Sequence, residues 1–356
     1  MSSTLGDRVR ISIFGQSHGE MIGAVIDGLP AGERIDPDAL KALMARRAPG
    51  QALTTPRSEK DAVRIVSGLV GDVTCGAPLC LLIENTDVRS ADYERLRRLP
   101  RPGHADLPAH IKWNGFNDVR GGGHFSARLT APLCAAGGIL MQLYARRGIR
   151  IGAHLYEAAG IRDTPMDPMR VSEKDLDALL KAPLPVFDRE AGEKMLSAVA
   201  EARREGDSRG GIVECAVLGL KPGLGEPMFG GLENLISRAV FAVPAVKGIE
   251  FGEGFGAARL RGSENNDPYR MGKDAPASVS NHAGGILGGL ATGAPLVFRA
   301  AFKPTPSIAL KQDTVDLAEM KDASLEITGR HDPCVALRAV PCVEAAAAAA
   351  LADLIL

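Results

Sequence analysis

The chain has 356 residues, 45% of them hydrophobic, and a formal net charge of −1 at pH 7. This composition predicts a globular protein with a large core, and the length alone suggests about two domains. The balanced charge argues against a nucleic-acid-binding protein, which usually has a basic excess. No run of about eighteen apolar residues predicts a membrane span.

The N-terminal stretch MSSTLGDRVRIS lacks the apolar core of a signal peptide, so we expect a cytoplasmic protein. No two cysteines are spaced as a CxxC pair, and most lie in apolar segments, which favours buried free thiols over disulfides or a zinc site. We therefore predict no metal centre. The cysteines are Cys75, Cys80, Cys134, Cys215, Cys334 and Cys342.

The first elements predicted are two strands and a helix. Residues 8–14 alternate in polarity and predict a strand that runs into the turn GQSHGE, which contains His18. Residues 22–26 predict a second strand, closed by DGLPAG. Asp36 is a good N-cap for a helix over residues 37–47, which begins with proline and ends before Pro49-Gly50.

Arginines are dense between residues 46 and 128, which indicates a pocket for a small anion in an otherwise neutral chain. Arg47, in the last helical turn, either complements the helix dipole or reaches a ligand. Strands are predicted at residues 62–70 and 78–84. Residues 85–100 are polar, and we expect them to be irregular, with Arg95, Arg97 and Arg98 on a solvated surface.

The central stretch combines a loop histidine with a glycine-rich turn. His104 lies in RPGHAD, and Gly121, Gly122 and Gly123 lead through Ser126 into an apolar helical pattern at residues 129–144. Free backbone N–H groups and the helix dipole make such a turn a ready anion site. Ser126 is a plausible N-cap, and Arg120 and Arg128 flank the turn. The alternative is a flexible loop followed by an ordinary capped helix.

The second half predicts a strand at residues 150–156 and amphipathic helices at 172–181 and 188–204. It then echoes the first half. GAVIDGLPAG (23–32) resembles CAVLGLKPGLG (215–225), and CGAPL (75–79) resembles TGAPL (292–296). The order is the same in both halves, which suggests a duplicated β/α unit.

Three later segments carry further candidate residues. SNHAGGILGG (280–289) is rich in glycine and contains His282, and FKPTPSI (302–308) offers donors for a phosphate, although it also fits a proline-stiffened turn. In GRHDP, Pro333 fits the first turn of a terminal helix, and Asp332 taken alone fits an N-cap.

Taken together, these segments resemble the chorismate synthase family. The matching motifs, in order, are FGQSHGEMIGAVIDGLPAG, RRAPG, NTDVRSADY, RPGHAD, RGGGHFSARLTA, SNHAGGILGG, FKPTPSI and GRHDPCVALRAVPCVEA. The resemblance implies an α/β (α+β) fold of the β-α-β sandwich type, built as one domain over residues 1–356 with an internal pseudo-two-fold repeat. This replaces the expectation of two domains. It also implies a homotetramer.

The resemblance implies the anti-1,4-elimination of phosphate from 5-enolpyruvylshikimate 3-phosphate, which gives chorismate in the shikimate pathway of aromatic amino acid biosynthesis. Reduced FMN is required, with no net redox change. By resemblance, His18 protonates the leaving phosphate, His104 protonates or neutralises the reduced flavin, and Asp332 helps to remove the ring proton. Histidine titrates near neutral pH and suits both acid roles.

Further ligand contacts follow from the same resemblance. Arg47 and Arg128 would hold the substrate's carboxylates and phosphate, or NADP, because a planar guanidinium suits these groups. FMN would contact His124, Phe125, Ser126, Ala245, Gly288, Lys303, Pro304, Thr305, Pro306, Ser307 and Arg330.

The sequence departs from the family pattern in three places. Gln16 replaces a glutamate beside His18, His124 and Phe125 replace an arginine and a serine, and the loop at Ala52 lacks a basic residue. An NADPH-dependent flavin oxidoreductase is the alternative enzyme class. No GxGxxG follows a predicted strand, which favours a separate flavin reductase over reduction of the flavin by NADPH in this chain. A non-catalytic anion-binding module is a third class.

Overall fold

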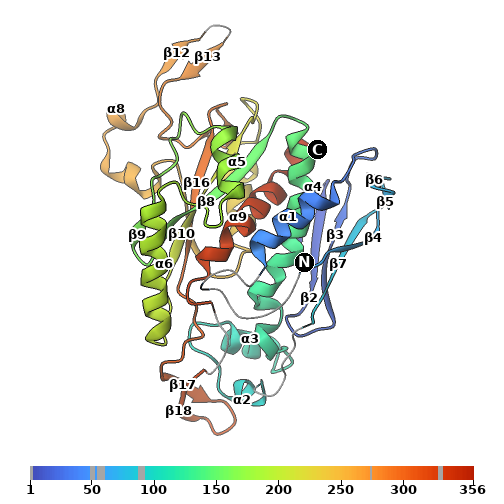
Figure 1. Cartoon of the computed structure of the whole chain (residues 1–356), viewed down its shortest axis with the longest axis vertical. Coiled ribbons are helices and arrows are strands. Elements are labelled where there is room, and N and C mark those ends of the chain that lie inside the picture. The colour runs from blue at the N-terminus through green and yellow to red at the C-terminus, as the bar shows by residue number, and fades with distance from the viewer. Residues whose placement is uncertain (1–2, 49–52, 54–60, 87–92, 273–274, 328–331) are drawn as a thin grey trace.

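The computed structural model describes residues 3–48, 53, 61–86, 93–272, 275–327 and 332–356. Two five-stranded antiparallel sheets enclose a layer of helices (Figure 1). In spatial order the first sheet is β1 (Thr4–Leu5), β2 (Arg10–Gly15), β3 (Met21–Asp27), β7 (Leu79–Glu84) and β4 (Arg64–Ser67). The second is β9 (Ile161–Arg162), β8 (Arg150–Ala158), β10 (Gly211–Leu218), β16 (Leu296–Phe302) and β11 (Val246–Phe251).

The helices between the sheets are α1 (Pro37–Arg47), α4 (Thr130–Ala145), α7 (Leu232–Val240) and α9 (Ala336–Ala350). Small residues let α4 and α9 approach closely, because a Cβ added at Gly137 would lie 2.5 Å from the Cα of Ala345. The two helices run in the same direction: Cys134 Sγ lies 3.8 Å from Cys342 Sγ near their starts. Both helices therefore begin at the same end of the molecule.

The outer face of the second sheet is also covered. Helices α5 (Glu173–Lys181) and α6 (Arg189–Arg204) lie on it, opposite the central helix layer (Figure 1). Ser172 and Asp188 cap these helices through their side chains, as residues just before a helix should. Leu176 of α5 packs on the backbone of Gly152 in β8, where a Cβ would lie 3.0 Å away.

The two halves of the chain repeat one arrangement. The order β2-β3-α1-β4-β7-α4 in the first half corresponds to β8-β10-α7-β11-β16-α9 in the second. Gly28 and Gly219 close equivalent turns at positive φ, where a Cβ would meet the carbonyl oxygens of Arg8 and Gly148. The segments CGAPL and TGAPL precede the equivalent strands β7 and β16. The duplicated unit suggested by these short matches is therefore present.

Short elements complete the fold. Hairpins are formed by β5 (Leu69–Val70) with β6 (Val73–Thr74), β12 (Tyr269–Met271) with β13 (Pro276–Ser278), β14 (Ile286–Leu287) with β15 (Leu290–Ala291), and β17 (Gln312–Asp316) with β18 (Lys321–Leu325). The remaining helices are α2 (Tyr93–Arg98), α3 (Asp106–Lys112), α8 (Gly262–Asn265), α10 (Ala352–Ile355) and the 3₁₀ turns η1 (Arg120–Phe125), η2 (Ala127–Leu129), η3 (Met228–Gly230) and η4 (Gly254–Arg259).

Local patterns predicted several of the main helices and strands. The helix at residues 37–47 has the predicted bounds, and the Asp36 side chain accepts hydrogen bonds from the N–H groups of Asp38 and Ala39. The prediction of an irregular segment at 85–100 is wrong over its second part, where α2 forms. The ion pair of Arg98 with Asp316 holds this helix in place. The terminal helix begins at Ala336, so Pro333 precedes it and Asp332 is not its N-cap.

Among the described residues, no helix is both long and apolar enough to cross a membrane. No group of three or more His, Cys, Asp and Glu side chains in the same part of the chain is arranged to hold a metal ion. All six cysteines are free thiols: Cys75 is exposed, Cys80 is half-buried and the other four are buried.

Candidate active site

The glycine triplet and His18 form one side of the site. Gly121, Gly122 and Gly123 all have positive φ, so the chain turns left-handed three times before η2 and α4. A Cβ on Gly121 would lie 2.2 Å from Cε1 and Nδ1 of His18, so the imidazole packs directly on this backbone. The N–H of Ser17 donates to the carbonyl of Gly123 over 3.0 Å. Only glycine allows this contact, because a side chain there would occupy the position of the ring.

His104 packs on the next glycine of the same loop. A Cβ on Gly122 would lie 3.0 Å from Cε1 and 3.4 Å from Nε2 of His104. Nδ1 of His104 is 3.0 Å from the carboxylate of Asp106, the first residue of α3. The triplet thus brings together two histidines that are 86 residues apart in the numbering, the difference of 104 and 18.

Burial alone would raise the pKa of Asp106, but hydrogen bonds from Arg101 and His104 outweigh it and lower the pKa well below its ordinary value. The Arg101 guanidinium donates to Asp106 through Nε over 2.7 Å and through Nη2 over 2.8 Å. Both side chains are about nine-tenths buried or more. Side-chain contacts between residues of the RPGHAD loop therefore hold its conformation.

The second half of the chain contributes the segment that follows β16. Lys303 donates through Nζ to the carbonyl of Gly103, and its backbone N–H donates to the carbonyl of Ala245 over 3.0 Å. Pro306 lies against Gly103, where a Cβ would be 3.2 Å away. Burial, and then Lys247, lower the pKa of Lys303. Ala245 has φ of 74°, a left-handed conformation that is rare without glycine and that clusters at functional sites.

Asp332 joins this segment to α9. Its carbonyl accepts from the Thr305 hydroxyl over 2.7 Å, and its carboxylate accepts from Nη1 of Arg338 over 2.9 Å. Nε of Arg338 also donates to the carbonyl of Arg47 over 3.1 Å. Arg338 therefore links the start of α9 to the end of α1.

Arg47 and Arg128 are brought together by Asp61. Each guanidinium donates through Nη1 to a different oxygen of that carboxylate, and all three side chains are buried. Burial would raise the pKa of Asp61, but the two arginines lower it. Among the described residues, two guanidinium groups therefore share this one carboxylate. A cavity of about 500 Å³ lies beside it, lined by Asp61, Ala62, Val63, Arg64, Leu82, Glu84 and Thr86.

Asn85 connects the arginine cluster to the His18 turn. Its side-chain oxygen accepts from Nε of Arg128 over 2.9 Å, and its Nδ2 donates to the carbonyls of Gln16 and Gly19. The predicted residues of both halves thus lie along one connected network of hydrogen bonds and packing contacts at the start of α4 and α9.

The aromatic part of RGGGHFSAR lies on the surface. The His124 ring stacks on Phe125 with centroids 4.3 Å apart, and Trp113 meets His124 edge-on at 5.1 Å. Ser126 caps η2 by accepting from the N–H of Arg128. His124 is therefore beside the triplet but is not enclosed as His18 and His104 are.

One predicted contact, Gly288, is not joined to this cluster among the described residues. Gly288 lies in the turn between β14 and β15, where the carbonyl of Gly289 accepts from the N–H of Leu232 at the start of α7, whereas Lys303 follows the end of β16. Arg330 lies outside the described residues. His282 is held by the carboxylate of Asp267 in the second half and was not assigned a role.

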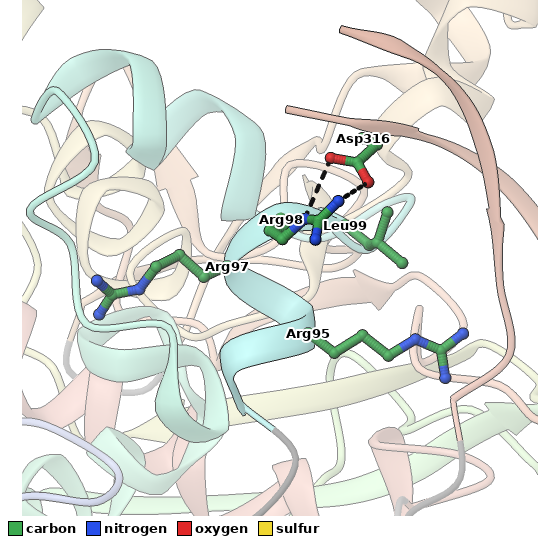
Figure 2. Close-up of a pocket in the computed structure, with 5 residues that line it drawn as sticks. All are labelled: Arg95, Arg97, Arg98, Leu99 and Asp316. Atoms are coloured by element: carbon green, nitrogen blue, oxygen red, sulfur yellow. Dashed lines mark hydrogen bonds and ion pairs between the residues drawn. The ribbon is translucent and has the colours of Figure 1, made fainter. Parts of the chain in front are cut away.

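The surface arginines of α2 are not gathered into the site. Arg98 pairs with Asp316 and Glu319. Figure 2 shows Arg95 and Arg97 pointing in opposite directions from α2, in a cavity of about 470 Å³ that Leu99 also lines. The expectation of a solvated charged surface is confirmed for these three residues.

The site also contains residues that were not predicted from the sequence, among them Asp61, Asp106 and Arg338. Two of these had a local signal: Asp106 lies five positions after Arg101, and Arg338 lies six positions after Asp332 in a motif already quoted. Asp61 had none, because its partners Arg47 and Arg128 lie in other segments.

Comparison with known proteins agrees with this arrangement. A family model described as chorismate synthase matches residues 9–356. The chorismate synthases of Lancefieldella parvula and of Dehalococcoides mccartyi strain BAV1 are each 47% identical to this chain. The alignments cover 99% and 100% of this chain and 96% and 97% of the relatives.

The fold comparison points the same way. A solved structure titled as the crystal structure of chorismate synthase matches with a TM-score of 0.76 at 26% identity, covering 98% of this chain and 91% of that one. The internal repeat, the histidine pair on the glycine triplet and these matches over nearly the full length lead to one conclusion. This chain belongs to the chorismate synthase family and is a lyase.

Proposed function

We propose that this chain converts 5-enolpyruvylshikimate 3-phosphate to chorismate by a 1,4-elimination, with reduced FMN bound, as a step of aromatic amino acid biosynthesis. The observation that carries the proposal is the pair of imidazoles, His18 and His104, packed on adjacent glycines of one left-handed loop. A positioned imidazole can protonate a departing phosphate, and a nearby helix N-terminus favours the negative charge of that group.

The residues present fit a flavin mononucleotide. Lys303, Thr305 and Ser307 offer a cation and two hydroxyls, and the starts of α4 and α9 lie at the same end of the molecule. The buried hydroxyl oxygen of Ser17 has no hydrogen-bond partner among the described residues, which is unusual for a buried polar group. The stacked rings of His124 and Phe125 supply a flat apolar wall. When bound, reduced FMN would lend an electron as phosphate departs and recover it afterwards.

The chain's own residues would carry the protons. His18, on Gly121, would give a proton to the departing phosphate oxygen as the carbon–oxygen bond breaks. Asp332, held through its carboxylate by Arg338, would help to accept the ring proton. His104 would neutralise the negative charge of the reduced flavin. The ring loses a proton and the phosphate anion, and the electrons of the broken carbon–hydrogen bond remain in the new double bond, so the reaction has no net oxidation.

Arg47 and Arg128 do not line the cavity beside Asp61, so they would act on a ligand there through their charge. Their guanidinium groups are almost wholly buried, with side chains 5% and 2% exposed, so direct contact with a substrate anion requires Asp61 to move aside. Their positive charges would still attract the phosphate and carboxylates of the substrate. FMN contacts at Gly288 and Arg330 remain part of the proposal.

We also propose a cytoplasmic homotetramer whose flavin is reduced by a separate reductase. Large apolar side chains of the first sheet that are exposed in one chain, such as Phe14 at 40% and Val66 at 49%, support assembly. A gel-filtration mass near that of one chain would contradict it.

The first test is anaerobic turnover of 5-enolpyruvylshikimate 3-phosphate with chemically reduced FMN, following phosphate and chorismate. Equal release of both products with no net flavin oxidation is expected. Consumption of NADPH linked to the flavin without phosphate release would indicate the oxidoreductase instead. Tight FMN binding with neither reaction would indicate a binding module.

The acid roles are tested by replacing each histidine. His18→Ala and His104→Ala should each lower kcat by about 10²- to 10⁴-fold, the usual contribution of a positioned acid. Circular dichroism and thermal unfolding should be close to those of the original chain. His110→Ala, in α3, is a matched control that should keep normal turnover. Near-normal rates in both site variants would reject the acid roles.

A further inference from the structure

Asp106 accepts three hydrogen bonds from Arg101 and lies within ion-pair distance of His104, all within a single loop. One oxygen, Oδ2, accepts from the backbone N–H of Arg101 over 3.1 Å and from Nε of Arg101 over 2.7 Å. The other, Oδ1, accepts from Nη2 of Arg101 over 2.8 Å and lies 3.0 Å from Nδ1 of His104. Asp106 is 6% exposed and Arg101 is 6% exposed, so water competes little for these bonds.

These contacts determine which ring nitrogen of His104 carries a proton. Nδ1 lies 3.0 Å from the Asp106 carboxylate and 3.3 Å from Nη2 of Arg101. A guanidinium can only donate and an ionised carboxylate can only accept. Nη2 already donates to Asp106, and charged acceptors form the stronger hydrogen bond. Nδ1 therefore donates to Asp106.

The opposite edge of the ring then faces the glycine triplet. Cε1 and Nε2 of His104 are the atoms nearest to the position of a Cβ on Gly122. With Nδ1 occupied, Nε2 is the nitrogen that remains to exchange a proton on this side. A neutral ring protonated only at Nε2 would instead turn the lone pair of Nδ1 toward the Asp106 carboxylate, which can only accept.

We propose that Asp106 is a positioning residue that holds His104 with Nδ1 protonated, so that Nε2 alone exchanges a proton with the ligand bound at the glycine triplet. This rests on the proposed function. The Nδ1 proton stays on the ring throughout, Asp106 does not become protonated, and the transferred proton leaves or enters at Nε2. Arg101 contributes by fixing the plane of the carboxylate through its two side-chain bonds.

The test uses the full chain with isotope-labelled histidine. In Asp106→Asn the side-chain amide offers a donor to Nδ1, so the neutral ring should change to the tautomer protonated at Nε2. Nitrogen and carbon NMR of the ring reports this directly, with His104→Ala identifying the signals. With the tautomer reversed, kcat should fall by about 10²- to 10⁴-fold, the scale seen when the analogous carboxylate of a catalytic triad is neutralised. FMN affinity should change by less than about threefold, a difference below 1 kcal/mol.

Further variants separate positioning from loop structure. Asp106→Glu keeps the charge and should restore the Nδ1-protonated ring and part of the lost kcat. Asp316→Asn breaks an arginine–carboxylate pair that involves no histidine, and it should leave both kcat and the His104 signals unchanged.

Three results would overturn the proposal. They are a His104 ring protonated at Nε2 in the unaltered chain, an unchanged tautomer in Asp106→Asn, and a reversed tautomer with normal kcat. The first does not depend on Asp106→Asn, so it decides the matter even if that variant does not fold. If the unaltered chain releases no phosphate, the proposed function fails, while the NMR result still decides whether Asp106 orients His104.

Discussion

The two sheets carry equivalent rows of residues on their outer faces, and these rows have diverged. In the first sheet the row is Phe14, Gly23 and Leu82 on neighbouring strands. Phe14 lies across Gly23, where a Cβ would be 2.4 Å from its ring, and it is 40% exposed. The row is apolar, and no element of the described chain is shown packed over it.

In the second sheet the equivalent row is His154, Glu214 and Arg299. The Glu214 carboxylate is hydrogen-bonded to Nε2 of His154 over 2.8 Å and accepts from Nε of Arg299 over 2.8 Å. The other ring nitrogen of His154, Nδ1, is hydrogen-bonded to Asp163 over 2.9 Å. Glu214 and His154 are fully buried beneath the segments around α5 and α6. Buried charges persist only when paired, and here His154 and Arg299 are paired with Asp163, Glu214 and Glu250.

The difference shows what the duplication preserved. The inner faces remained apolar because both pack on the same helix layer. The outer faces differ because only the second sheet has the added segment with α5 and α6 over it. Under that cover, one row became a buried charged network. The loops before α4 and α9 diverged in the same way: one has three left-handed glycines and the other has Asp332 and Pro333.

The largest effect is expected from breaking the charged row. Glu214→Ala leaves His154 and Arg299 without their shared partner in the interior, and should lower the free energy of unfolding by about 3–5 kcal/mol. The equivalent change in the first sheet, Leu82→Ala, removes a half-buried side chain and should lower it by about 1 kcal/mol. Denaturant unfolding of both variants measures the contrast. Similar losses would mean that the two rows are energetically alike.

The glycine loop before α4 should be nearly as sensitive, but in activity. Gly121→Ala places a Cβ at the His18 ring and should lower kcat by at least about 100-fold, the lower end of the loss expected when an acid is displaced. Gly71→Ala is the matched control, because its φ of 59° is close to the 57° of Gly121 but nothing lies within 4 Å of the added atom. Equal loss in both variants would point to backbone strain alone.

The shared helix layer should respond to smaller changes. Gly137→Ala in α4 forces a Cβ against the backbone of Ala345 in α9, and overpacking of this kind lowers stability by about 1–3 kcal/mol. Gly138→Ala meets only the side-chain ends of Leu43 and Leu40, which can shift, so its loss should be smaller. Thermal unfolding of the pair checks the order, and a larger loss for Gly138→Ala would reverse the assignment of the tight contact.

The smallest expected effect is a pH dependence confined to the second sheet. Burial lowers the pKa of His154, but hydrogen bonds and charge from Asp163 and Glu214 outweigh it and raise the pKa above its ordinary value. The folded state therefore holds its proton more tightly than the unfolded state. This contribution to stability is full below the unfolded value of about 6.5 and is lost as the pH rises through the folded pKa. His154→Gln should flatten the decline above about pH 6.5, and an unaltered slope would exclude His154 as its source.

Sequence patterns alone determined the local features of this protein. The helix at residues 37–47 and its Asp36 cap follow from hydrogen bonds and spacing within one turn, so a short window contains the whole cause. The resemblance named the family from motifs along most of the chain. It also singled out His18 and His104, whose loops are marked by glycine.

Only the tertiary structure decided which charged groups meet. Asp61 was not chosen because its partners, Arg47 and Arg128, lie 14 and 67 residues away. The same is true of the row from His154 to Arg299, which exists only once three strands are paired. Electrostatic partners are selected by distance in space and by burial, and neither is encoded in a local window of sequence.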